Sequence, residues 1–323
     1  MLILLLKMLP LILLSLAGYV LCRIRWVDAA FNRQLSLVML NVFYPCLIIS
    51  SILGNFTWET LLGNWVMPAG TIFILVTGWV VGRLTLPLLK RQPEHTKRCY
   101  QFVCMMNNYS FLPILMAASL WGEKAVALIV LSALGSELCV WTLGVKSITG
   151  QKFGRGFFRH IMSLPMIALL VSFALVALRA VCERNGCVPA GDTAAGELLK
   201  NVLATCRMAG AATIPASALI CGARIAMIHP QRLFSPLILG TSILRIAVTP
   251  ALCIAVLLLL PLEPETRRVL VLIATMPVAM ASVTLAEAYR SDADFSASAI
   301  LLTHLLCLIT IPLWLALTGV GVR

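Results

Sequence analysis

The chain has 323 residues, of which 60% are apolar and only 12% are charged, and its mean hydropathy is +0.97. A soluble domain carries about 25% charged residues, so this composition excludes a soluble enzyme, a disulfide scaffold and a disordered chain, and predicts a polytopic membrane protein. The formal net charge of +12 would suggest a nucleic-acid partner in a soluble protein, but in a membrane protein it is typical of basic cytoplasmic loops.

Runs of about 20 mostly apolar residues, each long enough to cross a bilayer as a helix, follow one another along the chain. They predict ten spans at 2–22, 35–54, 65–86, 100–120, 124–145, 160–180, 200–221, 235–260, 267–287 and 295–319. We interpret the first run as a span and not as a cleaved signal peptide, because it is as long as a full span. The breaks are too short to hold a separate soluble domain.

Basic residues are unevenly divided between the two sets of alternating loops. The loops that begin after the first span contain most of the lysines and arginines, including Arg23, Lys90 and Lys146, whereas the other set contains Glu183 and Glu263. Because cytoplasmic loops are enriched in lysine and arginine, the first set is predicted to be cytoplasmic. We therefore expect a multi-pass protein of the cell (inner) membrane with both termini on the non-cytoplasmic side and with no nucleic-acid partner.

The two halves of the chain share weak internal similarity. Pro45 in the second span and Pro215 in the seventh are 170 positions apart, and Trp121 and Tyr289 are 168 apart. Each unit has five spans, an odd number, so the second copy must be inverted in the membrane, as in many transporters. The predicted domains are a first repeat over 1–145, a cytoplasmic linker over 146–159 and a second repeat over 160–323.

Proline and polar residues in mid-span predict broken helices in the second, fourth, seventh and ninth spans, marked by Pro45, Pro113, Pro215 and Pro277. The fourth and ninth breaks correspond, because Asn108 and Pro277 are 169 positions apart. Paired breaks indicate a substrate site, since irregular backbone in a membrane occurs where it lines a cavity or packs within protein. The alternative is that these prolines are harmless kinks.

These motifs, in this order and spacing, resemble the auxin efflux carrier family of permeases over essentially the whole chain. The residues that carry the resemblance are Asn41–Leu47, Asn108–Pro113, Trp121-Gly122, Thr213-Ile214-Pro215 through Gly222, Thr275-Met276-Pro277, Ala286–Asp292 and Thr310-Ile311-Pro312. One departure is Asn108-Tyr109-Ser110, where many members have Asn-Thr-Gly, and it bears on the choice of substrate because these residues would line the pocket.

The resemblance implies an all-α fold of two inverted five-helix repeats, with the fourth and ninth helices unwound and crossing at the centre. Spans 1, 2, 6 and 7 would form a scaffold, and spans 3, 4, 5, 8, 9 and 10 a transport domain. The family includes plant auxin exporters and bacterial carriers annotated for malonate and malate. We therefore expect a secondary transporter of a small organic anion, such as malate, malonate or an auxin-like acid, that moves in an elevator-like manner.

Ionisable side chains inside predicted spans are costly and usually functional. Glu137 and Arg245 permit two interpretations: a structural ion pair, or a proton-carrying Glu137 beside an Arg245 that binds an organic carboxylate. His304 is the repeat neighbour of Glu137 and titrates near neutrality when unperturbed. Glu137 and His304 are therefore the candidate ion-coupling residues.

The candidate substrate-binding residues are Asn107, Asn108, Tyr109, Ser110, Tyr44, Thr213, Pro277, Ser282 and Arg245. We predict no catalytic residues, no enzyme activity, no cofactor and no metal site. The proton is the expected coupling ion. Sodium coupling, a transporter-like receptor, a homodimer and a disulfide between Cys182 and Cys187 are left open.

Overall fold

The computed structural model describes residues 2–109, 111–150, 164–185, 193–227 and 235–320, and every regular element in these ranges is a helix. Seven of the described helices are long and apolar enough to cross a membrane, and two shorter apolar helices accompany them. The predicted all-α membrane architecture is confirmed at this level. Residues 151–159 of the predicted linker, and Cys187 of the candidate disulfide, lie outside the described residues.

The first half of the chain begins with one long helix and ends with a long helix interrupted by a π-helical turn. Its elements are α1 (Leu2–Arg23), α2 (Ala29–Val38), η1 (Met39–Phe43), α3 (Tyr44–Asn55), α4 (Trp58–Gly63), α5 (Val66–Thr85), η2 (Leu86–Leu89), α6 (Glu94–Met105), α7 (Phe111–Trp121), α8 (Glu123–Cys139), η3 (Val140–Gly144) and α9 (Val145–Thr149).

The described part of the second half has a similar series of helices. Its elements are α11 (Leu164–Arg184), α12 (Ala194–Ala211), α13 (Thr213–Met227), α14 (Pro236–Ile243), η5 (Leu244–Val248), α15 (Thr249–Leu259), α16 (Pro264–Ala274), α17 (Ala281–Ala288) and α18 (Ala293–Leu317).

Three of the four predicted break prolines lie in the first turn of a helix. Pro45, Pro113 and Pro215 are the second or third residues of α3, α7 and α13. At the start of α7, which follows an unwound segment, proline costs no helical hydrogen bond. The prediction of a broken second span is wrong, because η1 continues directly into α3 as a π-helical turn. The seventh span is interrupted only at Ala212, between α12 and α13.

Helix α1 packs closely along α13, and their contact depends on two glycines. A Cβ atom at Gly18 would overlap the backbone of Leu219, and one at Gly222 would overlap the backbone of Ser15. Small residues allow helices to approach this closely in membranes. Helix α3 packs against both α11 and α12, and α5 packs against α6 and α8.

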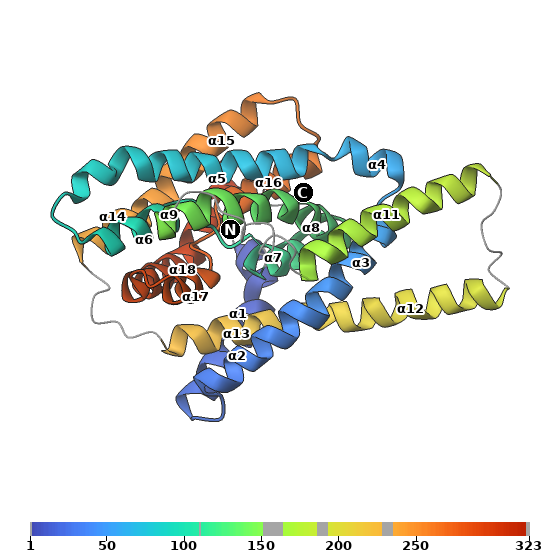
Figure 1. Ribbon diagram of the computed structural model, residues 1–323, viewed down its shortest axis with the longest axis horizontal. Helices are drawn as coiled ribbons and strands as arrows, with labels where there is room; N and C mark the ends of the chain where they lie inside the picture. Colours follow the sequence, from blue (N-terminus) through green and yellow to red (C-terminus); the bar gives the residue numbers. More distant parts are fainter. Residues whose placement is uncertain (1, 110, 151–163, 186–192, 228–234, 321–323) are drawn as a thin grey trace.

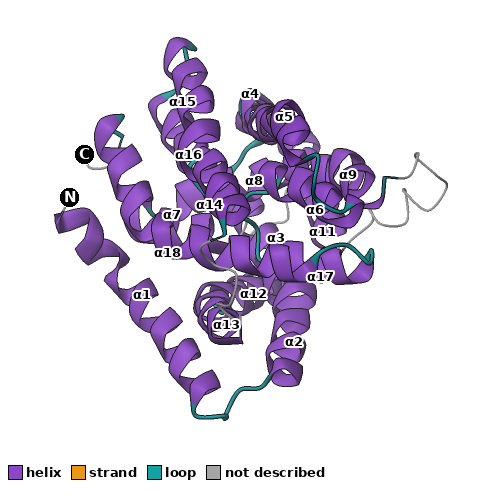
Figure 2. Ribbon diagram, turned by 90° about the vertical axis from the view of Figure 1, so that its left-hand side faces the viewer, coloured by secondary structure: helices purple, strands orange, loops and turns teal. Residues whose placement is uncertain are grey.

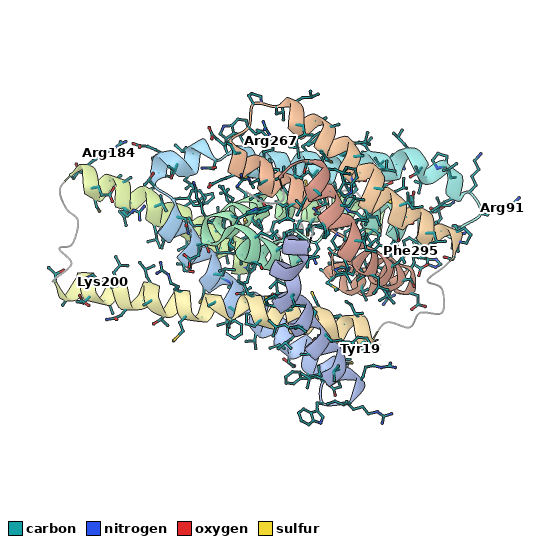
Figure 3. The ribbon with its side chains drawn as sticks, turned by 180° about the vertical axis from the view of Figure 1, so that it is seen from behind. Tyr19, Arg91, Arg184, Lys200, Arg267 and Phe295 are labelled. Atoms are coloured by element: carbon teal, nitrogen blue, oxygen red, sulfur yellow. The ribbon has the colours of Figure 1, made fainter. Side chains whose placement is uncertain are left out.

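Helices α5, α11 and α12 run roughly along the longest axis of the molecule, whereas α1 crosses this direction (Figures 1 and 2). Helices α1, α2 and α13 lie together on one side, and α4, α5 and α15 on the opposite side (Figures 1 and 2). Figure 3 places Arg91 at one end of the molecule and Arg184 and Lys200 at the other. Arg91, from the loops predicted to be cytoplasmic, is therefore far from Arg184 and Lys200, from the other set of loops.

Candidate functional site at the helix crossing

Two unwound segments meet in the interior, one between α6 and α7 and the other between α16 and α17. Asn107 and Val278 form an isolated antiparallel bridge, and the Asn108 N–H donates to the carbonyl oxygen of Pro277 at 2.8 Å. Backbone groups must be satisfied internally where water is absent, and each segment does this for the other. The predicted breaks in the fourth and ninth spans are present, and they form a crossing.

Arg245 joins the C-terminal ends of the two half-helices that lead into the crossing. Its side chain is fully buried, and Nε donates to the Met276 carbonyl at 3.1 Å. The two terminal nitrogens donate to the carbonyls of Ala274, at 3.3 Å, and Cys104, at 3.5 Å. Helix C-termini expose unpaired carbonyls and carry partial negative charge, so a cation here stabilises both α6 and α16.

These contacts contradict the interpretation of Arg245 as the ion-pair partner of Glu137, whereas its binding of a carboxylate stays a prediction. Its hydrogen bonds are made to backbone carbonyls, and among the described residues it has no ion pair with Glu137 or any other carboxylate. Through these three contacts Arg245 positions the two segments of the crossing.

Asn107 and Asn108 each use only part of their side-chain amide within the protein. Asn107 Nδ2 donates to the Ile273 carbonyl at 2.8 Å, and Asn108 Oδ1 accepts from the Leu112 N–H at 3.4 Å. Both side chains are buried, and Asn107 Oδ1 and Asn108 Nδ2 have no partner among the described residues. Buried polar atoms are almost always hydrogen-bonded, so these two atoms mark where a ligand or water can bind. Ser110 lies outside the described residues.

Glu137 on α8 is the centre of a second group of side chains, which we call the carboxylate cluster: Glu137, Tyr109, Trp141 and Tyr44. The Tyr109 hydroxyl donates to Glu137 Oε1 at 3.0 Å, and Trp141 Nε1 donates to Oε2 at 2.9 Å. Tyr44 is buried close enough to interact electrostatically with Glu137 and Tyr109, and its hydroxyl has no hydrogen-bond partner among the described residues. The cluster therefore links α3, the crossing and α8.

Three other candidates are buried polar residues that form no hydrogen bond to the carboxylate cluster among the described residues. Thr213 begins α13 and Ser282 lies in the first turn of α17, and both hydroxyls are without a partner there. His304 Nδ1 lies 2.9 Å from the Ile300 carbonyl on its own helix, while Nε2 has no partner. The structure thus does not join His304 to Glu137 by a hydrogen bond.

The comparison with known families matches residues 3–155 and 155–315 to a family described as membrane transport protein. The chain belongs to this family of membrane transport proteins, the auxin efflux carrier family. The resemblance inferred from the motifs is confirmed at the level of the family.

Relatives of this family member occur in plants and archaea. The chain is 22% identical to Protein PIN-LIKES 5 of Arabidopsis thaliana, over 91% of this chain and 90% of that protein. It is 24% identical to Protein PIN-LIKES 1 of the same plant, over 50% of this chain but only 30% of that protein. An uncharacterized transporter of Methanocaldococcus jannaschii is 26% identical over 66% of this chain and 65% of its own length.

Sequence reasoning missed two side chains, one at the carboxylate cluster and one at the crossing. Trp141 is four residues after Glu137, so the helical period alone places both on one face of a helix. The Thr303 hydroxyl accepts from the Val278 N–H at 3.3 Å and thereby supports the second unwound segment. No local pattern indicates Thr303, because its partner is distant in the chain.

Gly78 on α5 is expected to be essential for the close approach of α5 to the crossing. A Cβ atom there would lie 2.6 Å from the Cys104 carbonyl oxygen and 3.4 Å from the Arg245 guanidinium. We expect Gly78→Ala to lower the free energy of unfolding by about 1–3 kcal/mol, the usual cost of overpacking, and therefore to lower the unfolding temperature of the purified protein. In Gly240→Ala the added methyl group has no atom within 4 Å, so this control should unfold at nearly the same temperature as the unmodified protein. Equal unfolding temperatures for the two variants would contradict the prediction.

Proposed function

We propose that this protein is a secondary active carrier for a small organic anion that binds at the helix crossing. The observation that carries the proposal is the pair of buried asparagines where two unwound segments meet, each with one amide atom that has no partner among the described residues. A small carboxylate offers acceptors for Asn108 Nδ2, and a hydroxyl group or a bridging water offers a donor for Asn107 Oδ1.

The charge around the crossing favours an anion. The N-terminal ends of α7 and α17 adjoin the crossing and carry partial positive charge. Arg245 adds a buried guanidinium whose hydrogen bonds go to neutral carbonyls, so its charge has no carboxylate counterpart among the described residues. A bound carboxylate would supply the missing negative charge.

We propose that the chain is built of two inverted five-helix repeats, and that the part containing the crossing moves across the membrane in an elevator-like manner. The interrupted pairs α6/α7 and α16/α17 stand at corresponding places in the two halves. Helix α1 packs on α13 of the second half, and α11 packs on α3 of the first half, which is the exchange expected of inverted copies. Helices α1, α3, α11, α12 and α13 would then belong to a scaffold against which the crossing moves, and the basic-residue asymmetry would place both termini outside the cytoplasm.

The proton is the coupling ion that the carboxylate cluster favours. Both Glu137 oxygens already accept a hydrogen bond, one from Tyr109 and one from Trp141. A sodium site requires several convergent oxygens with free lone pairs, whereas a carboxylate held by two donors can still gain and lose a proton as its surroundings change.

Uptake into proteoliposomes tests this function. We expect at least one of malate, malonate and indole-acetate to accumulate under an imposed pH gradient and not under a sodium gradient alone. Asn108→Ala should reduce this uptake by about ten-fold, the effect of losing one buried hydrogen bond to the substrate. Asn201→Ala, at an exposed position on α12, is the matched control and should transport normally.

Three results would each contradict a part of the proposal. Absence of uptake for every acid under both gradients would exclude a carrier of this class. Uptake that Asn108→Ala leaves unchanged would remove the crossing as the binding site. Accumulation driven by sodium alone would replace the proton as the coupling ion.

A further inference from the structure

A basic hollow of about 750 Å³ lies at the end of the molecule where α5 ends and α6 begins. Its walls come from α5, η2, α6 and α9. They are joined by hydrogen bonds from Trp79 Nε1 to Ser147 Oγ, at 3.1 Å, and from Gln101 Nε2 to the Trp79 carbonyl, at 2.6 Å. The hollow is therefore bounded by packed helices and not by a mobile loop.

The charge of this hollow is strongly unbalanced. Five cationic side chains line it, Arg83, Lys90, Lys97, Arg98 and Lys146, against the single carboxylate of Glu94. Lys97 Nζ lies 2.8 Å from Glu94 Oε1, and this hydrogen bond holds the pKa of the Glu94 carboxyl below its usual value, so the pair stays ionised and neutral overall. Arg83 and Lys90 have no hydrogen-bond or ion-pair partner among the described residues, so their charges are available to an anion.

A second, largely apolar groove of about 820 Å³ adjoins the basic hollow. The two share Pro87 and Lys90, at the turn that follows α5. The groove runs between η2 and α14, and it has Leu88 and Ile243 on its walls, which are 83% and 55% exposed. From Pro236 to Leu244 the wall on α14 extends about 12 Å along the helix, a length that matches the upper part of an acyl chain.

We propose that the two hollows form one binding site for an anionic glycerophospholipid. The phosphate headgroup would bind among Arg83, Lys90 and Arg98, and an acyl chain would lie in the groove beside α14. The apolar groove that continues from the basic hollow favours a lipid over a free phosphate compound, which would use only the charged part. Figure 3 shows Arg91, which also lines the groove, at this end of the molecule.

Helix α6 connects this lipid site to the crossing, so a bound lipid would affect transport. Four lining residues, Glu94, Lys97, Arg98 and Gln101, belong to α6, and this helix leads directly into the unwound segment of the crossing. A lipid anchored here would hold that end of α6 at the membrane surface. The binding itself does not depend on the identity of the transported anion.

The test measures thermal unfolding of the detergent-purified protein with three additives at equal concentration. Dioctanoyl-phosphatidylglycerol should raise the unfolding temperature, whereas dioctanoyl-phosphatidylcholine and glycerophosphate should not. In the double variant Arg83→Gln/Lys90→Gln, the lipid concentration needed for half of the shift should rise about 30-fold, because each basic side chain near an anionic lipid contributes about five-fold. The control Arg25→Gln/Arg33→Gln removes two exposed arginines outside both hollows and should behave as the unmodified protein.

Each contrary outcome overturns a stated part of the proposal. An equal response to the zwitterionic lipid would show that the cations are not used. An equal response to glycerophosphate would show a site for free phosphate. An unchanged response of the double variant would place the lipid elsewhere. If the double variant does not fold, Lys90→Gln alone can be compared in the same way, because it removes the cation shared by both hollows.

Discussion

Glu137→Gln is expected to abolish pH-gradient-driven uptake while leaving exchange of substrate across the membrane intact. Glutamine has nearly the shape of glutamate but carries no proton between the two sides. It retains one acceptor oxygen for Trp141 Nε1, and the Tyr109 hydroxyl can rotate to accept from the new amide. The local fold should therefore survive, and only the coupled step should fail.

Two assays on the same proteoliposomes separate these effects. Net uptake driven by a pH gradient should fall by at least about 100-fold, whereas counterflow of labelled substrate at equal pH should remain within about three-fold. Glu59→Gln changes an exposed carboxylate at the start of α4 and serves as the matched control. Driven uptake by Glu137→Gln at the normal rate would show that this carboxyl does not carry the coupling proton.

Arg245→Met is expected to be the most destabilising single substitution at the crossing. It removes the donors to the carbonyls of Cys104, Ala274 and Met276 in a place that water does not reach. Buried polar groups left without a partner cost about 1–3 kcal/mol each, so we expect a loss of at least about 3 kcal/mol and a large fall in unfolding temperature. Arg245→Lys should be intermediate, because an ammonium group cannot reach all three carbonyls.

Arg179 offers a matched control on the surface of the molecule. It also donates to two backbone carbonyls, of Leu53 and Phe56, at 3.1 and 2.7 Å, but its side chain is 39% exposed. In Arg179→Met water can replace the lost donors, so the unfolding temperature should change little. If Arg245→Met instead keeps a normal unfolding temperature and loses only uptake, then Arg245 is a substrate ligand and the positioning role is wrong.

The residues around the crossing show which parts of the site could be predicted from the sequence. Proline and asparagine at corresponding places in the two halves predicted the unwound segments, and the offset of 169 paired Asn108 with Pro277, whose backbones are in fact hydrogen-bonded. If the two halves are related copies, as proposed, equivalent positions would meet near their common centre, and this accounts for the offset. In the second span the same reasoning failed at Pro45, since a π-helical turn accommodated the proline without unwinding the helix.

The sequence by itself determined the all-helical membrane class and the family, because these depend on composition, on local apolar runs and on short motifs. Only the tertiary structure decided what the buried charges contact. Arg245 has its partners at positions 104, 274 and 276, and Glu137 has one of its two donors at Tyr109. Such partners are chosen by how distant helices pack, and a guanidinium finds an acceptor equally well in a carboxylate or in the carbonyls of a helix end.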